Sequence, residues 1–259
     1  MTEGMLSITL PGGLAVPVND SGQGSPVLLL HGGAGPESVA GFGEQLAARY
    51  PVRVLTPVHP GFGGTERPAS LASIRDLAGV YAALLDQLGL TGVTVAGSSI
   101  GGWIAAEVAL ASPHAAKLVL IDAVGLASAG HPVADFFSLT PAEVAERSWE
   151  HPEGRALDVS SMTPDQRTIL AGNRAALEAY GGQSMADPGL GGRLGSVAVP
   201  ALVLWGEADR IATPEYGKEY AAALPGASFR LLRGAGHLPQ LETPEAVLEM
   251  LGEFLGFAG

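Results

Sequence analysis

The sequence predicts an α/β fold, in which helices cover both faces of a mostly parallel β-sheet. Short apolar runs alternate along the chain with segments of helical spacing, an alternation typical of parallel sheets. Two of the runs, 26–30 (PVLLL) and 201–205 (ALVLW), are continuously apolar, as expected of strands that are buried on both faces. With 259 residues, of which 47% are hydrophobic and 15% charged, the chain is long and apolar enough to form such a core.

The first half of the chain supplies these elements in regular order. Segments 6–10 and 14–18 predict an opening hairpin with a turn at Pro11-Gly12-Gly13. The apolar residues from Ile74 to Leu88 recur at helical spacing, and Gly89 ends that helix. The further strands are expected at 26–30, 52–56, 93–96 and 117–121, and the helices at 38–49, 74–88 and 100–112.

The strand rhythm stops after Asp122 and returns near Val199. Capping-box patterns at Thr140 and Thr163 indicate that the interval is helical. We therefore divide the chain into a core that contains the sheet, residues 1–123 and 198–259, and a helical cap, residues 124–197.

The last part of the chain predicts two more strands and two more helices. The strands are expected at 201–205 and 228–232, and the helices at 214–224 and 244–257. Both helices begin with Thr-Pro-Glu, and we expect Thr213 and Thr243 to cap their free amides.

Composition and charge exclude several classes of protein. Lys and Arg number 14 against 26 Asp and Glu, a formal charge of −12 that repels phosphate backbones and anionic lipids. The chain has no cysteine, which excludes disulfides and thiolate catalysis. No apolar run approaches the roughly 18 residues of a membrane span, and the first residues lack a secretory pattern. We expect a cytoplasmic protein with a small-molecule substrate, no nucleic-acid or membrane partner, and an oligomeric state that the sequence leaves open.

The stretch VAGSSIGGW contains two adjacent serines between a predicted strand and a predicted helix. The G-x-S-x-G pattern fits Ser99, because Gly97 and Gly101 then stand two residues before and after it. Centred on Ser98, the pattern would require Ile100 at a crowded position of the turn. Ser99 is therefore the candidate nucleophile, and the helix that follows points its amides at the site.

A nucleophilic serine needs a base and an acid that orients the base. His237 lies in the glycine-flanked loop GAGHLPQ after the predicted strand at 228–232, where an open α/β sheet binds ligands. Asp209 follows the strand at 201–205 and lies between Ser99 and His237 in chain order, which favours it as the acid. Asp122, at the end of strand 117–121, is the competing candidate, and Glu207 is a third.

The loop HGGAG after the strand at 26–30 is the candidate oxyanion hole. Its glycines let the backbone approach a bound oxygen closely, so the amide of Gly33 or Ala34 can act together with that of Ile100. We expect His31 to brace this loop and not to act as a base.

Taken together, these motifs resemble those of the α/β-hydrolase superfamily over essentially the whole chain. The matching pieces are HGGAG, HPGFGGTERP, GSSIGGW, GEADRIATPE and GAGHLPQLETPE, in that order. The resemblance implies an eight-stranded sheet, a triad of Ser99, Asp209 and His237, and a helical cap after the sixth strand. Members often have aspartate where His59 stands, so His59 is open to a role in substrate contact or in structure. Serine at position 99 argues against haloalkane dehalogenases and the related epoxide hydrolases, which use aspartate there.

The resemblance implies a serine hydrolase that cleaves an ester, a carboxylester or a lactone, of a small apolar substrate without a metal or organic cofactor. The alternatives are hydrolysis of a carbon–carbon bond in a diketone, perhydrolase, lyase or cyclase chemistry, and a ligand receptor with slow turnover. The side chains that we expect around an apolar pocket, each with core packing as the alternative, are Trp103, Phe136, Phe137, Trp149, Met162, Tyr180 and Met185.

Overall fold

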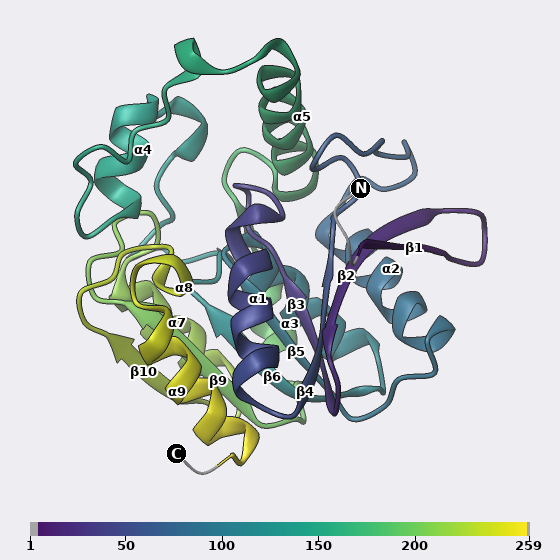
Figure 1. Cartoon of the computed structure of the whole chain (residues 1–259). Coiled ribbons are helices and arrows are strands. Elements are labelled where there is room, and N and C mark those ends of the chain that lie inside the picture. Colours follow the sequence, from purple (N-terminus) through teal and green to yellow (C-terminus); the bar gives the residue numbers. More distant parts are fainter. Residues whose placement is uncertain (1–4, 258–259) are drawn as a thin grey trace.

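The computed structural model describes residues 5–257, and an eight-stranded sheet forms its centre (Figure 1). The strand order is β1-β2-β4-β3-β5-β6-β9-β10. Strand β2 runs antiparallel to its neighbours β1 and β4, and the other pairs of this sheet are parallel. The strands are β1 (Met5–Thr9), β2 (Ala15–Gly22), β3 (Ser25–Leu30), β4 (Val52–Pro57), β5 (Val93–Ser98), β6 (Ala115–Ile121), β9 (Ala201–Gly206) and β10 (Ser228–Leu232). The predicted mostly parallel sheet and its opening hairpin are confirmed.

Helices cover both faces of the sheet and create a separate apolar core on each (Figure 1). Because side chains alternate along a strand, Val27 and Leu29 of β3 enter one core while Leu28 and Leu30 enter the other. The first core is covered by α1 (Glu37–Arg49) and α9 (Pro244–Leu255), and the second by α2 (Ile74–Gln87), α3 (Ile100–Ala111) and α7 (Pro214–Ala223).

The order of the strands opens a crevice between β3 and β5. From β3 the chain crosses to β4 on one side, and it then returns to β5 on the other side of β3. The loops that leave the carboxyl ends of β3 and β5 therefore diverge, and an open α/β sheet binds ligands at such a point. The HGGAG loop follows β3 and Ser99 follows β5, so the topology brings both motifs to the same crevice.

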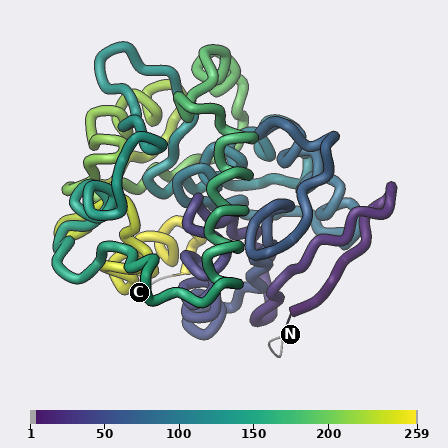
Figure 2. Tube along the Cα trace, turned by 90° about the horizontal axis from the view of Figure 1, so that it is seen from above, coloured from purple at the N-terminus to yellow at the C-terminus, as the bar shows by residue number. Residues whose placement is uncertain are grey.

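Residues 124–197 lie over the carboxyl end of the sheet, and Figure 2 looks down on them from above. Capping boxes begin α4 at Thr140 and α5 at Thr163, as the sequence predicts. A parallel pair of two-residue strands, β7 and β8, was not expected. The elements are β7 (Gly125–Leu126), η1 (Phe136–Ser138), α4 (Pro141–Ser148), η2 (Val159–Ser161), α5 (Pro164–Gly181), β8 (Ala186–Asp187) and α6 (Leu190–Leu194). The division into core and cap stays a prediction.

Two helix caps differ from the expectation. Thr213 and Thr243 do precede the first helical prolines of α7 and α9, but neither side chain accepts a hydrogen bond from its helix. The Thr213 hydroxyl is buried and has no hydrogen-bond partner in the described part of the chain, and that of Thr243 donates to the carbonyl of Pro239 at 3.4 Å. The short helix α8 (Pro239–Glu242) explains the second case, because Thr243 is both the C-cap of α8 and the N-cap of α9. Across residues 5–257, the helices are too short or too polar for a bilayer span.

Candidate active site

Ser99 occupies a strained turn between β5 and α3. Its φ of +56° lies in the left-handed region, which non-glycine residues adopt rarely and mostly at functional sites. A Cβ atom on Gly97 would lie 2.1 Å from the carbonyl oxygen of Gly101, and one on Gly101 would lie 2.3 Å from that of Leu30. The two flanking glycines are therefore required by close backbone contacts, in agreement with the G-x-S-x-G pattern.

The two adjacent serines have different surroundings. Ser98 is fully buried, and its hydroxyl contacts the amide of Gln240 at 3.3 Å below the turn. Ser99 is half-buried, and its Oγ lies 2.9 Å from Nε2 of His237. Only Ser99 combines access from outside with a neighbouring base.

A hydrogen-bonded chain runs from Ser99 through His237 to Asp209. Nδ1 of His237 lies 2.7 Å from Oδ2 of Asp209, and both side chains are buried. The other carboxylate oxygen of Asp209 accepts the amides of Ile211 and Ala212 at 2.8 and 3.1 Å, which fixes the carboxylate. With Nδ1–H donating to Asp209, Nε2 is free to accept the proton of the serine hydroxyl.

Asp122, the competing acid, lies beside this hydrogen-bonded chain, but the carboxylate that is bonded to His237 belongs to Asp209. One carboxylate oxygen of Asp122, one carboxylate oxygen of Asp209 and one ring nitrogen of His237 all lie within 4.8 Å of one another. Asp122 is fully buried, and its Oδ1 accepts the amide of Gly206 at 2.9 Å. Burial, followed by the charge of Asp209, raises the pKa of Asp122 well above its ordinary value. The neutral carboxyl that this favours can donate a hydrogen bond to the Asp209 carboxylate. Glu207, the third candidate, is exposed.

The HGGAG loop lies against the serine turn. A Cβ atom on Gly32 would lie 3.3 Å from Cβ of Ser99, so loop and nucleophile are in direct contact. Among the described residues, the amides of Gly33, Ala34 and Ile100 donate to no carbonyl or side chain. Ile100 is the first residue of α3, where amides have no partner within the helix. These three amides are available to a developing negative charge, as the candidate oxyanion hole requires.

The expected pocket residues occupy two environments. Trp103, Tyr180 and Met185 are buried, and Trp103 packs against Gly125 while the Tyr180 hydroxyl donates to the carbonyl of Pro60 at 3.0 Å. The other residues, which are half-buried, are Phe136, Phe137, Trp149 and Met162. Their contact with substrate stays a prediction.

The half-buried aromatic residues are held by cations. The guanidinium of Arg174 lies 5.2 Å from the ring centroid of Phe137, and that of Arg155 lies 4.5 Å from the ring of Trp149. The backbone of Trp149 also lies against Gly236, the neighbour of His237. Of the expected pocket residues, Trp149 is thus tied directly to the histidine loop.

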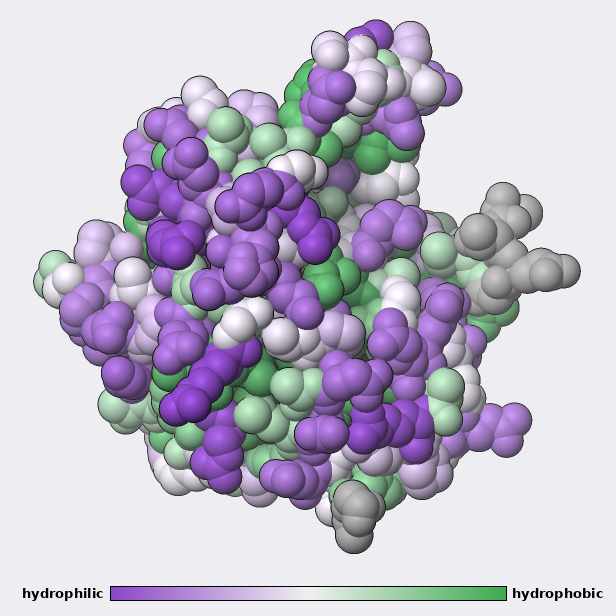
Figure 3. Space-filling model, turned by 60° about the vertical axis from the view of Figure 1, so that its left-hand side comes forward, coloured by the Kyte–Doolittle hydropathy of each residue, from purple (hydrophilic) through white to green (hydrophobic). Residues whose placement is uncertain are grey.

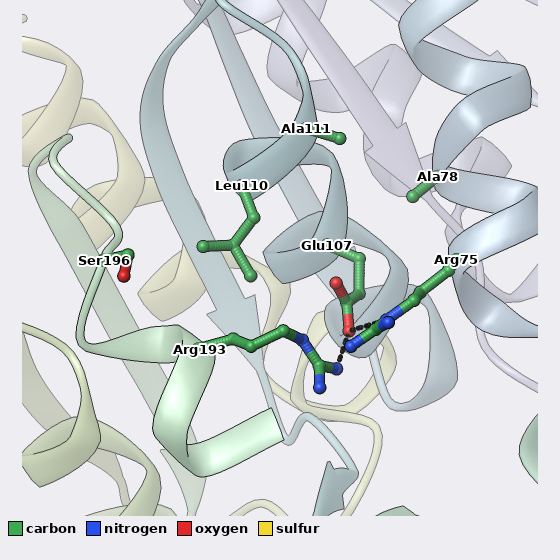
Figure 4. Close-up of a pocket in the computed structure, with 7 residues that line it drawn as sticks. All are labelled: Arg75, Ala78, Glu107, Leu110, Ala111, Arg193 and Ser196. Atoms are coloured by element: carbon green, nitrogen blue, oxygen red, sulfur yellow. Dashed lines mark hydrogen bonds and ion pairs between the residues drawn. The ribbon is translucent and has the colours of Figure 1, made fainter. Parts of the chain in front are cut away.

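A groove of about 400 Å³ lies elsewhere on the molecule, between α2, α3 and α6 (Figure 4). Two arginines, Arg75 and Arg193, converge there on the buried Glu107, and Arg193 also binds Asp187 at 2.7 Å. Glu107 lies about two turns along α3 from Ser99. Because its charges are paired with one another, this groove is not the candidate active site. Its lining residues are Arg75, Ala78, Glu107, Leu110, Ala111, Arg193 and Ser196.

Sequence reasoning missed three polar residues near the site. Gln240 bonds both Ser98 and the carbonyl of Ser38, and Asn173 of α5 accepts the amide of Gly63 at 2.9 Å. Tyr81 of α2 bonds Nδ1 of His59, which is fully buried and so has no contact with solvent. The sequence could have pointed to Asn173, because it is a polar residue on the buried face of α5.

The fold and the site together define a class of protein: an α/β fold with a serine on a strand–helix turn, a histidine and an acid. A model of the alpha/beta hydrolase family matches residues 27–250. The chain belongs to this family, and it is a hydrolase.

Related proteins are similar to this chain over nearly its whole length. The 2-hydroxy-6-oxononadienedioate/2-hydroxy-6-oxononatrienedioate hydrolase of Cupriavidus pinatubonensis is 32% identical and aligns with 92% of this chain and 89% of its own. A thermophilic esterase from Thermogutta terrifontis is 27% identical, with a TM-score of 0.75 and 97% coverage of both chains. A meta-cleavage product hydrolase from Pseudomonas fluorescens has a TM-score of 0.77 and 98% coverage of both chains, but its 20% identity shows the fold alone.

Proposed function

We propose that this protein is a carboxylesterase-like serine hydrolase, in which Ser99 is the nucleophile, His237 the base and Asp209 the orienting acid. The observation that carries the proposal is the hydrogen-bonded chain of 2.9 and 2.7 Å between these side chains. The half-buried serine and the unpartnered amides of Gly33, Ala34 and Ile100 support it.

The reaction proceeds in two halves. His237 Nε2 takes the proton of Ser99 as its Oγ attacks the ester carbonyl, and the amides stabilise the resulting oxyanion. His237 then gives this proton to the leaving alcohol, and the acyl group remains on Ser99. Water loses a proton to His237 as its oxygen attacks the acyl carbonyl. The bond between the acyl carbon and Ser99 Oγ then breaks, His237 returns the proton to Oγ, and the acid leaves. Throughout, Asp209 holds the imidazole in one tautomer and stabilises its charged form.

The side chains that contact the site favour a small, apolar substrate. Leu177 of α5 lies against Gly33, and Ile100 follows the nucleophile in the buried core. These apolar contacts suit an uncharged acyl chain.

Hydrolysis of a carbon–carbon bond is the second candidate, and one observation favours it. The name of the Cupriavidus relative specifies a dicarboxylate with hydroxyl and oxo groups, and that relative shares 32% of its aligned residues with this chain. The same nucleophile, base and amides serve either reaction, so the substrate decides between them.

The deciding experiment compares the wild type with Ser99→Ala and Ser98→Ala. We expect turnover of p-nitrophenyl acetate, butyrate, octanoate or laurate that Ser99→Ala abolishes and Ser98→Ala largely keeps. The second substitution is the matched control, because it removes a neighbouring hydroxyl that is hydrogen-bonded to Gln240 and not to His237 within the described part of the chain. A 2-hydroxy-6-oxo-dienedioate is assayed in parallel. If the enzyme hydrolyses this dienedioate but none of the esters, the esterase proposal is wrong and carbon–carbon bond hydrolysis takes its place.

Two other functions have less support. Perhydrolase, lyase or cyclase chemistry would use the same residues, and no contact distinguishes them. A ligand receptor would present a continuous apolar surface to its partner. The face in Figure 3 is mostly hydrophilic, and its hydrophobic residues form small, separate patches. Multiple turnovers per serine in the ester assay would exclude the receptor.

A further inference from the structure

A pair of histidines lies buried behind the candidate oxyanion loop. The rings of His31 and His59 stack with their centroids 3.6 Å apart and their planes at 28°, and neither residue is exposed to solvent. His31 begins the HGGAG loop after β3, and His59 lies 28 residues later, beyond β4. Neither histidine takes part in the hydrogen-bonded chain that joins Ser99, His237 and Asp209.

The hydrogen bonds of the pair fix the tautomer of each ring. Nε2 of His31 accepts the backbone amide of His59 at 3.1 Å, so the proton of His31 is on Nδ1, which donates to the carbonyl of Gly32 at 2.8 Å. Nε2 of His59 donates to the carbonyl of His31 at 2.9 Å, which leaves Nδ1 to accept the hydroxyl of Tyr81.

Burial keeps these three groups in the forms that the hydrogen bonds require. It lowers the pKa of His31 to about 4 and that of His59 well below its ordinary value, so both rings are neutral. It also raises the pKa of Tyr81 well above its ordinary value, so the hydroxyl keeps the proton that it donates.

The acceptors of the two imidazole protons are carbonyls of the oxyanion loop itself. A peptide unit is planar, so the carbonyl of Gly32 and the amide of Gly33 turn together. The bond from His31 therefore sets the direction of the Gly33 amide. In the same way, the bond from His59 sets the peptide unit between His31 and Gly32. A Cβ atom on Gly101 would lie 2.5 Å from the His31 carbonyl, which places this unit against the serine turn.

We propose that Tyr81, His59 and His31 form a positioning relay, in which the Tyr81 hydroxyl selects the His59 tautomer and the two imidazoles aim the Gly33 amide at the oxyanion. The relay rests on the proposed function, since it acts through the oxyanion hole. It gives His59 a positioning role without substrate contact. Tyr81 of α2 thus acts on the reaction from behind the loop.

The test is Tyr81→Phe, which removes the hydroxyl and keeps the ring. Loss of one oxyanion donor costs about 10²–10³-fold in rate, and a misdirected donor costs part of that, so we expect kcat for p-nitrophenyl butyrate to fall roughly 10-fold. KM should change little, because the oxyanion forms only in the transition state. Affinity for a trifluoromethyl ketone, whose adduct carries an oxyanion, should fall with kcat.

Tyr220→Phe is the matched control. Tyr220 is also a fully buried tyrosine, but its hydroxyl has no hydrogen-bond partner among residues 5–257, so kcat should stay at the wild-type value. A second pair of variants tests His59. His59→Gln keeps a donor and an acceptor and should retain more kcat than His59→Leu, with thermal unfolding measured on each to establish that it is folded.

The outcomes separate the relay from the proposed function. Wild-type kcat and ketone affinity in folded Tyr81→Phe and His59→Leu would overturn the relay, while labelling of Ser99 by a fluorophosphonate would still support the nucleophile. A wild-type enzyme that neither reacts with the fluorophosphonate nor turns over an ester would overturn both. A lower unfolding temperature with unchanged kcat would reduce the relay to a structural brace and so overturn it.

Discussion

At the scale of single residues, the site contains two buried carboxyls of which one holds the histidine. Asp209 accepts the Nδ1–H of His237 and two backbone amides, and these bonds hold its carboxylate in place. Asp122 accepts one amide and lies beside that charge, so its neutral form is favoured. Of the two carboxyls, Asp209 is the one that contacts the histidine.

Asp209→Asn and Asp122→Asn should consequently differ strongly. Asparagine at 209 cannot act as the charged acceptor of His237, and we expect kcat to fall by roughly 10³–10⁴. Asparagine at 122 keeps an acceptor for the Gly206 amide and a donor toward Asp209, so kcat should stay within a few-fold of the wild type. Steady-state kinetics with p-nitrophenyl butyrate measures both. If Asp122→Asn proves the more damaging, the assignment of the acid is reversed.

At the scale of elements, the turn between β5 and α3 depends on the absence of side chains at Gly97 and Gly101. The contacts of 2.1 and 2.3 Å that a Cβ atom would make are with backbone oxygens, which cannot move without displacing a strand or helix. The turn also holds Ser99 at its positive φ, so strain and close packing occur in the same few residues.

Gly97→Ala should therefore destabilise the protein, whereas Gly79→Ala should not. Overpacking typically lowers the free energy of unfolding by about 1–3 kcal/mol. Because the contacts at Gly97 are rigid, we expect the loss in Gly97→Ala to lie at the upper end of this range or beyond it. Gly79 lies within α2 with no atom within 4 Å of a Cβ, and alanine there should add up to about 1 kcal/mol through helix propensity. Urea unfolding measures both free energies. Equal stability of Gly97→Ala and the wild type would contradict the crowded turn.

Local patterns predicted most of the elements but not every contact at their ends. The strands and helices of the sheet region follow apolar periodicity, which is a local property, and the capping boxes at Thr140 and Thr163 are local as well. The caps at Thr213 and Thr243 fail because neighbouring segments determine where those hydroxyls point. Helix α8 was missed because it is a single turn after the His237 loop.

The candidate site shows the same division between local and long-range information. Ser99 and the glycines around it were predictable from spacing, and Asp209 from chain order. The stack of His31 on His59 was not, because it joins loops 28 residues apart and depends on the order of β3 and β4 in the sheet. The roles of the catalytic and pocket residues stay predictions until variants are assayed.

At the scale of the whole molecule, the buried histidines make stability depend on pH. The pKa of His31 is about 4 in the folded protein against 6.5 for an ordinary histidine, and that of His59 is also lowered. As pH falls below about 6.5, the unfolded chain binds protons that the folded protein does not, so the free energy of unfolding falls. The stabilisation is complete above pH 6.5 and is lost for His31 by about pH 4. Asp122 acts in the opposite direction, since its pKa is raised on folding.

Urea unfolding between pH 7 and 4 should show this loss, with a slope of up to about 1.4 kcal/mol per pH unit for each histidine. His59→Gln removes one of the two titrating rings, so its slope should be smaller than that of the wild type. His151→Gln is the control for the substitution itself, because residue 151 is exposed and takes no part in the buried pair. A slope in His59→Gln equal to that of the wild type would show that the His59 ring titrates outside this range.

The separation of the site residues along the chain has a consequence for synthesis on the ribosome. His237 follows Ser99 by 138 residues, so the serine emerges long before its base. At about 5–20 residues per second, this interval lasts roughly 7 to 28 s. During that time a nascent chain can form the serine turn and the glycine loop, but it lacks the imidazole that activates the hydroxyl. If Ser99 serves the proposed function, the growing polypeptide carries a dormant nucleophile, and we expect its reactivity to begin only after β9 and β10 join the sheet.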